Sequence, residues 1–346
     1  MEAISTVNTS TDNKILKEFI TTTTESLNDV KDIHEVESLL DKVIAHPFKL
    51  KFDNLKLWLL STFFVLLGAA YIYFIATTRN YDMSWIDLGS FLILIVGVVW
   101  PLKIVGKRAQ SIQNLNNLFI VKTRDLLYRI TLSSQHFRET INNKFVDFNR
   151  GNYSQNVSWC KELEFNYNDK KMKVDALQHH YVVERIVEEK VRNGRGGYKT
   201  VRRKVYDHYY REGIVFPPIA EFKSLVISND SLHKKYSESF KPTSIVFDEH
   251  FYVMAESEFS AAKFLGPSVV LAFEDLNKKF KGLTFEIAPD GSILINQKQT
   301  GLLNTNISTS INTPVEFKQD LLKNLTLDNV NIMFAFMNNL IKYLGK

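Results

Sequence analysis

The sequence predicts an α+β protein in which a two-helix transmembrane hairpin with flanking amphipathic helices is followed by a cytoplasmic mixed α+β domain containing a long basic β-hairpin. Three observations lead to this prediction. Two uncharged apolar runs lie between residues 57 and 105, and apolar residues recur at helical spacing on both sides of these runs. From about residue 159, apolar residues alternate with a period of two, which is typical of strands.

The first apolar run has the length of a membrane span. Leu57 to Ala76 contains twenty residues without a charge, and a helix of that length rises ~30 Å, which matches the hydrocarbon core of a bilayer. The second run, Leu88 to Leu102, rises only ~22 Å as a helix, so we expect flanking apolar residues to extend it to 85–105. Pro101 is expected in its last turn, where a lost backbone hydrogen bond costs least. Two buried helices of a soluble protein are the less favoured interpretation.

Basic residues are concentrated outside the short segment that joins the two runs. They are Lys49, Lys51, Lys56, Lys103, Lys107 and Arg108, against Arg79 alone in the joining segment. Because positively charged flanks remain in the cytoplasm, we expect both termini there. The high content of Asn, Lys, Ile and Phe is typical of an AT-rich bacterial genome, so the predicted location is a bacterial inner membrane.

Amphipathic helices are predicted on both sides of the hairpin. In residues 1–48, apolar residues recur at helical spacing, and Asp32 followed by Glu35 is typical of a helix start. Residues 107–150 show a similar pattern without Gly or Pro, which predicts a long connecting helix. We expect the apolar faces to pack against the rest of the chain or a sister subunit. Binding to the membrane surface is the less favoured alternative.

Residues 155–346 are predicted to form the cytoplasmic α+β domain. Alternation indicates strands around residues 163–167, 181–185 and 199–215, and the glycines between Val191 and Val201 predict a hairpin turn. Further along the chain, we expect a strand at 244–256, a helix at 259–280, a hairpin formed by 283–288 and 292–296, and a terminal helix at 328–344.

The predicted long hairpin is basic. Between His179 and Gly213 it contains nine basic and five acidic residues, a net charge of +4. Tyrosines lie among these charges, so the hairpin could contact a protein partner, nucleic acid or anionic lipid headgroups. The candidate contact residues are Arg192, Arg195, Lys199, Arg202, Arg203 and Lys204. We favour a solvated hairpin whose acidic and basic residues pair across the strands.

Motifs for catalysis, cofactors and metals are weak. The run Asn193–Tyr198 resembles a phosphate-binding loop only in composition, since such a loop must lead from a strand into a helix. His179 and His180 are neighbours on a predicted strand and so point to opposite faces. His208 and His250 lack an acidic residue at the helical spacing of a zinc site. We therefore predict no catalytic residue, cofactor or metal, and an enzyme is less favoured than a binding protein.

Cysteine content and charge add two limits. Cys160 is the only cysteine, so the chain cannot form an internal disulfide or a cysteine-based metal cluster. No base is evident beside it in the sequence. The net charge of +5 is mildly basic, which is compatible with anionic surfaces without requiring one.

The segment Phe247–Pro267 resembles the signature of a bacterial membrane-anchored family known as domain of unknown function 3137. The matching residues are Phe247, Phe251, Val253, Ala255, Ala261, Leu265 and Pro267. The Phe-rich segment Gly213–Ser224 and the hairpin Leu283–Ile295 are also similar to that family, so the resemblance covers residues 155–297.

This resemblance implies a membrane helix hairpin joined to a cytoplasmic α+β domain, and no known reaction, substrate or cofactor. The chain also departs from the family. Where the family favours an Asp, an Arg and a Thr, this chain has Ser257, Ala262 and Gly266. These differences put in doubt any polar site that those groups form.

The expected function is that of a binding or scaffolding module anchored in the inner membrane, acting through the Phe-rich segment and the basic hairpin. Expected partners are the lipid bilayer, further copies of the chain that associate through its helices, and a protein. Nucleic acid or anionic headgroups at the hairpin are not favoured. The alternative is a membrane-tethered enzyme or effector that acts on lipid, nucleotide or nucleic acid. A pore ranks last, because only Ser61, Thr62 and Ser90 are polar within the runs.

Overall fold

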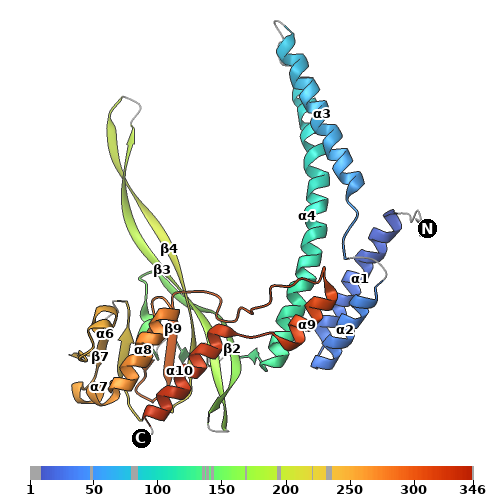
Figure 1. The fold of residues 1–346 in the computed structure, drawn as a ribbon. Coiled ribbons are helices and arrows are strands. Elements are labelled where there is room, and N and C mark those ends of the chain that lie inside the picture. The colour runs from blue at the N-terminus through green and yellow to red at the C-terminus, as the bar shows by residue number, and fades with distance from the viewer. Residues whose placement is uncertain are drawn as a thin grey trace. The chain divides into compact units, whose positions relative to one another are not determined.

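A computed structural model gives the fold of the chain, which is α+β (Figure 1). It describes residues 9–46, 50–78, 85–134, 137, 140–141, 144–167, 170–192, 196–219, 221–230 and 236–344. The chain forms two compact units, one of residues 1–126 and 307–325 and the other of residues 127–306 and 326–346. Residues 307–325 therefore belong with the helices of the first unit, whereas the sequence analysis assigned them to the α+β domain.

Two amphipathic helices open the first unit, as predicted. α1 spans Thr9–Asp29 and α2 spans Ile33–Ala45. The predicted helix start is confirmed, because the Asp32 carboxylate accepts a hydrogen bond from the backbone N–H of His34 at 3.2 Å. The apolar side chains that the two helices bury include Leu16, Ile20, Leu27, Val36, Leu39, Leu40 and Val43.

A third helix of this unit, α9 at Pro314–Lys323, was missed by the sequence analysis. It packs against α2. Lys318 forms ion pairs with Glu37 at 3.0 Å and with Asp41 at 2.7 Å, and Phe317 is fully buried. At ten residues, α9 is too short for its periodicity to be distinctive.

Two further helices of the first unit are long and apolar enough to cross a membrane: α3 at Leu55–Thr77 and α4 at Trp85–Leu127. They lie side by side (Figure 1), and the Ser61 hydroxyl donates a hydrogen bond to the Val98 carbonyl at 3.5 Å. Most of their apolar side chains are exposed, and Ile93 has 66% of its surface open. Exposed apolar surface of this extent is typical of helices that contact lipid.

α4 is one continuous helix of 43 residues, and it differs from the prediction in two ways. Pro101 lies in its interior and not in a last turn. The helix predicted over 107–150 is correct only in its first part, because α4 ends at Leu127. The chain then forms β1 at Thr131–Leu132 and a 3₁₀ helix, η2, at Val146–Asn149. Thr131 and Leu132 pair with β2 of the sheet, so they are not helical as predicted.

The second unit is built on a sheet that has nine antiparallel strands within the described residues, in the order β1-β2-β3-β4-β9-β8-β5-β7-β6. The remaining strands are β2 Ser154–Tyr167, β3 Lys170–Arg192, β4 Tyr198–Phe216, β5 Leu225–Ser228, β6 Glu238–Ser239, β7 Tyr252–Ala255, β8 Thr284–Ile287 and β9 Ile293–Gln297. The predicted strands at β2, β3 and β4 and the hairpin β8–β9 are confirmed. Gly196 has a φ of 86°, in agreement with the predicted turn between β3 and β4.

Helices α8, at Pro267–Lys279, and α10, at Asp328–Leu344, share one apolar core with the sheet. Phe273 of α8 lies 5.1 Å from Phe285 of β8 and 5.1 Å from Phe336 of α10, measured between ring centroids. Edge-to-face rings at this spacing add to the burial of apolar area. The predicted terminal helix is thus confirmed as a core element.

Two predicted elements of this unit were wrong. The strand expected at 244–256 is a short helix, α6 at Ile245–His250, followed by β7. Ser244 caps α6, which explains the helix. The single helix expected at 259–280 is divided into α7, at Glu258–Phe264, and α8. Pro267 begins α8 and cannot continue α7, because it has no backbone N–H.

Candidate functional site

β3 and β4 extend well beyond the rest of the sheet as a two-stranded ribbon (Figure 1). Among the described strands, β2 pairs with β3 as far as Val182, and β9 pairs with β4 from Glu212 onward. Between these limits β3 and β4 pair only with each other, from Val183 opposite Asp207 to Arg192 opposite Tyr198. At ~3.4 Å per residue this ribbon is about 30 Å long. We call residues 183–192 and 198–207 the ribbon arm.

We call residues 183–189 and 201–207 the shaft of the ribbon arm and the paired residues beyond them its tip. Charges on the shaft are paired across the two strands. Four ion pairs join β3 to β4: Arg185–Asp207, Glu184–Lys204 at 2.9 Å, Glu188–Arg202 at 2.7 Å and Glu189–Arg203 at 3.6 Å. The hydrogen bond between Lys204 and Glu184 raises the pKa of the lysine and lowers the pKa of the glutamate. Each exposed pair contributes little to stability. Together they set the register and neutralise the shaft.

For three candidate residues, the observed pairing agrees with the favoured interpretation of a solvated hairpin. Arg202, Arg203 and Lys204 have acidic partners, as the solvated-hairpin interpretation predicted. Arg192 and Lys199 lie near the tip of the ribbon arm, are exposed, and form no ion pair among the described residues. Arg195 lies outside the described residues. The unbalanced positive charge is therefore located at the tip.

The ribbon arm also exposes large apolar side chains. Tyr198 has 71% of its surface open and Ile186 has 64%. Val191 and Val201 are exposed as well. Alternation along the strands places the valines on one face and Ile186 with Tyr198 on the other. At the base of the arm Tyr153 packs 4.7 Å from the ring of Tyr206, and Asn152 hydrogen-bonds the backbone of Glu184. Beyond this base, the exposed side chains of both faces contact no helix or strand outside the arm among the described residues.

The two phenylalanines of the Phe-rich segment, Phe216 and Phe222, pack into the core. Phe216 is fully buried at the end of β4 and lies 5.2 Å from the ring of Phe165. Phe222 is partly buried against the same core, 5.4 Å from the ring of Phe264. The apolar residues that suggested a binding strand are thus explained by core packing.

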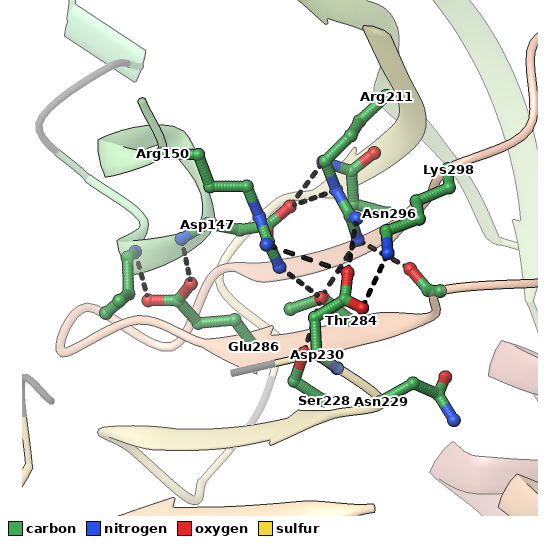
Figure 2. A network of polar contacts seen from close by, with 12 residues as sticks. Asp147, Arg150, Arg211, Ser228, Asn229, Asp230, Thr284, Glu286, Asn296 and Lys298 are labelled. Atoms are coloured by element: carbon green, nitrogen blue, oxygen red, sulfur yellow. Dashed lines mark hydrogen bonds and ion pairs between the residues drawn. The ribbon is translucent and has the colours of Figure 1, made fainter. Parts of the chain in front are cut away.

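A buried polar network lies where the ribbon arm leaves the sheet (Figure 2). Its centre is Asp147 of η2, which is fully buried. The carboxylate accepts hydrogen bonds from Arg150 Nε at 2.6 Å, Arg211 Nε at 2.9 Å and Asn296 Nδ2 at 2.6 Å. Burial alone would raise the pKa of Asp147, but the charges of Arg211 and Arg150 outweigh it and lower the pKa to about 2. We call these residues and their partners the root network.

Arg211 of β4 connects the root network to three other segments. Its side chain is fully buried. Nη2 donates to the Gly282 carbonyl at 2.6 Å and to Thr284 Oγ1 at 3.0 Å, and Nη1 donates to Asp230 Oδ2 at 3.2 Å. A planar guanidinium with this many fixed acceptors holds its strand in one position.

Asp230 closes the network on its solvent side. Its carboxylate pairs with Lys298 at 2.7 Å and with Arg150 at 3.6 Å, in addition to Arg211. Figure 2 shows these three cations converging on it. The three cations are balanced by Asp147, Asp230 and Glu286. The balance of buried charge is typical of a structural network.

Glu286 of β8 fixes η2 in place. Its carboxylate accepts a hydrogen bond from the N–H of Val146 at 2.7 Å and another from the N–H of Asp147 at 3.2 Å. A carboxylate at the first N–H groups of a helical turn satisfies donors that have no partner within that turn. The orientation of Asp147 toward Arg211 therefore depends on a residue far away in the sequence.

His179 lies beside the root network and opposite Arg211 in the β3–β4 ladder. It is fully buried against the ring of Phe148, 4.9 Å away, and its two ring nitrogens have no hydrogen-bond partner among the described residues. Burial lowers the pKa of His179 to about 4, despite the opposing charge of Asp147. The imidazole is therefore neutral at physiological pH.

His180, His208 and Cys160, also considered for chemistry, make local polar contacts. His180 points to the opposite face from His179, as predicted, and its Nε2 lies 3.0 Å from Nδ1 of His208 across the strands. The buried thiol of Cys160 lies 3.2 Å from the Ser133 hydroxyl. Among the described residues, no group of three or more His, Cys, Asp or Glu side chains is arranged to hold a metal ion.

Sequence patterns could not reveal the root network, because its members come from η2, β4, β8, β9 and the segment after β5. The charged residues of the ribbon arm, in contrast, are contiguous and were identified. Comparison with known proteins adds no analogy, since no family model, curated protein or solved structure matches this chain.

Proposed function

We propose that this protein is a membrane-anchored binding module that holds a protein partner through the ribbon arm. The proposal rests on one observation: a ribbon about 30 Å long exposes large side chains on both faces beyond its base, where Tyr153 packs against Tyr206. A two-stranded ribbon is only marginally stable alone, and ordering its residues costs conformational entropy. Contact with a partner would bury the exposed side chains and stabilise the ribbon.

The chemistry of the ribbon arm favours a protein over nucleic acid. Nucleic-acid binding depends on cations that neutralise several phosphates along the backbone. On the shaft, four cations already have acidic partners. What the ribbon arm offers instead is exposed valines on one face and isoleucine with tyrosine on the other. Aromatic and aliphatic side chains with a charged rim are typical of a protein interface.

The anchor of this module is proposed to be a transmembrane hairpin formed by α3 and α4. Its support is the length, apolar composition and exposure of the two helices. The excess of basic residues outside the joining segment supports a cytoplasmic position for both termini. On this proposal, the second unit lies in the cytoplasm at a bacterial inner membrane. Membership of the family known as domain of unknown function 3137 is part of the same proposal.

A homo-oligomer is proposed through the helices of the first unit. α1 and α9 each combine a buried apolar side with exposed apolar residues, among them Ile15 and Val315. Self-association would present several ribbon arms from one assembly and so increase the avidity for a multivalent partner. This arrangement is that of a scaffold.

Crosslinking mass spectrometry in native membranes tests the proposal. The full chain would be compared with an arm-deleted variant in which residues 184–206 are replaced by Asn-Gly, a two-residue turn that closes hairpins. We expect a protein that crosslinks through Lys190, Lys199 or Lys204 in the full chain. Because the deletion removes these lysines, the result that counts is that the same protein no longer crosslinks to any remaining lysine of the deleted variant. Crosslinks through Lys278, which lies on α8, serve as the internal control.

A charge-matched variant controls for nonspecific effects. Glu188→Gln combined with Arg202→Gln removes one ion pair and leaves the net charge of the ribbon arm unchanged. This variant should retain the partner. A partner that crosslinks equally well to the arm-deleted chain, or no protein crosslinked through the arm, would refute binding by the ribbon arm.

A further inference from the structure

Two histidines meet on one face of the sheet, just before the ribbon arm begins. His180 lies opposite Tyr210 and His208 lies opposite Val182 in the β3–β4 ladder, so the two histidines are diagonal neighbours on the same face. His180 Nε2 lies 3.0 Å from His208 Nδ1. His180 is half-buried and His208 is exposed, so small ions in the solvent reach these nitrogens. We call the two residues the histidine pair.

Asn156 of β2 fixes the tautomer of His180. Its side-chain oxygen lies 3.0 Å from His180 Nδ1. Because an amide oxygen only accepts hydrogen bonds, this ring nitrogen carries the proton. His180 Nε2 therefore has a lone pair, which accepts the hydrogen bond from His208 Nδ1. A histidine that binds a metal typically donates its other N–H to an oxygen in this way, which orients the ring and makes the binding nitrogen more basic.

The surroundings of the histidine pair hold its rings and leave the local charge balanced. The ring of Tyr210 stacks on His180, with 4.6 Å between the centroids and 20° between the planes. The planes of the two imidazoles differ by only 2°. Next along the same face, Glu184 and Lys204 form an ion pair at 2.9 Å, so their charges cancel beside the pair. A divalent cation at the histidine pair would thus not meet an unpaired lysine.

The spacing of the two facing nitrogens fits two ligands of one metal ion. Bonds of ~2.1 Å at a right angle place two ligand nitrogens ~3.0 Å apart, whereas a tetrahedral angle places them ~3.4 Å apart. The observed 3.0 Å fits the right angle, which Cu(II) and Ni(II) prefer. Without metal, the proton on His208 Nδ1 lies between the nitrogens. Transfer of this proton through water to Nε2 of the same ring, with rotation of that exposed ring, would present a second lone pair to the metal and leave both histidines neutral.

We infer that the histidine pair binds a divalent transition metal of the class of Ni(II) and Cu(II), with water in the remaining positions. The two histidines are 28 residues apart in the chain, so no sequence motif marks them. Because one ligand comes from β3 and the other from β4, the metal would join the two strands between the root network and the ribbon arm. This inference goes beyond the proposed function and does not depend on a protein partner.

Calorimetric titration of the purified, untagged full-length protein with Ni(II) and with Mg(II) tests the inference. We expect one saturable Ni(II) site at the histidine pair and no binding of Mg(II), which prefers oxygen ligands. His208→Gln should weaken Ni(II) binding at least about tenfold, because a second ligand on the same surface acts at a high effective concentration. His34→Gln removes an exposed histidine on α2 and should bind Ni(II) as the wild type does.

Two further variants separate metal binding from folding and from the ribbon arm. Asn156→Ala should weaken Ni(II) binding about tenfold, and Asn156→Asp, which keeps an acceptor for His180 Nδ1, should restore it. The arm-deleted variant retains both histidines and should bind Ni(II) as the full chain does, so failure of this inference is distinguishable from failure of arm binding. No saturable Ni(II) binding, unchanged binding by His208→Gln, or equal binding of Mg(II) would overturn the site.

Discussion

Substitution of Asp147 by Asn should destabilise the second unit strongly. Asp147 is the shared acceptor of Arg150, Arg211 and Asn296, and none of its surface is exposed. The lowering of its pKa from 3.8 to about 2 corresponds to ~2 kcal/mol in favour of the ionised form. Removing one partner of a buried ion pair leaves an uncompensated charge and costs about 3–5 kcal/mol. The cost of about 3–5 kcal/mol applies to Asp147→Asn, because the partner left without its counter-charge, Arg211, is also fully buried.

The measurement is thermal unfolding of the purified full chain, followed by tryptophan fluorescence. Trp159 lies in the second unit and reports on it. For a unit of this size, a loss of ~4 kcal/mol lowers the unfolding temperature by about 10 °C. Asp207→Asn is the matched control, since it breaks an exposed ion pair with Arg185 and should cost less than ~1 kcal/mol. If the two variants unfolded at the same temperature, the network would not bear the stability assigned to it.

Three further predictions concern the same unit. The pKa of His179 is about 4 in the folded protein against 6.5 in the unfolded chain. Its neutral form therefore stabilises the folded state above pH 6.5, and this contribution to the free energy of unfolding falls by ~3 kcal/mol as the pH drops to 4. His179→Phe should flatten this part of the dependence of the unfolding free energy on pH. Gly213→Ala should cost ~3 kcal/mol in urea unfolding, because its Cβ would meet the Ile295 carbonyl oxygen. Lys204→Gln should leave the midpoint of urea unfolding unchanged, and a clear fall of the midpoint in the same assay would contradict the assignment of its exposed ion pair as weak.

Local patterns were sufficient for much of the fold. The uncharged runs identified α3 and α4, the period-two alternation identified β2, β3 and β4, and Asp32 marked the start of α2. Each of these signals depends on residues close together in the chain. They fail where tertiary contacts decide the outcome. The segment after Leu127 has a helical pattern, but its pairing with β2 and the position of η2 are set by distant strands.

The candidate site was predictable only in its exposed part. The basic hairpin was visible because its charges are contiguous, and the register then explained which of them pair. The root network was not visible, since Asp147, Arg211, Asp230 and Glu286 are individually ordinary charged residues on segments far apart in sequence. Their burial, which makes them significant, is a property of the folded sheet.

The position of the root network suggests why a binding protein would contain it. Arg211 and His179 face each other in the ladder only four residues before the ribbon arm begins at Val183 and Asp207. A fully buried guanidinium with four acceptor groups fixes β4 at that point. Without such a clamp, an arm about 30 Å long would convert a small rotation at its root into a large displacement at its tip. The network would therefore set the direction of the arm, and partner affinity in Asp147→Asn should fall even at a temperature where the protein remains folded.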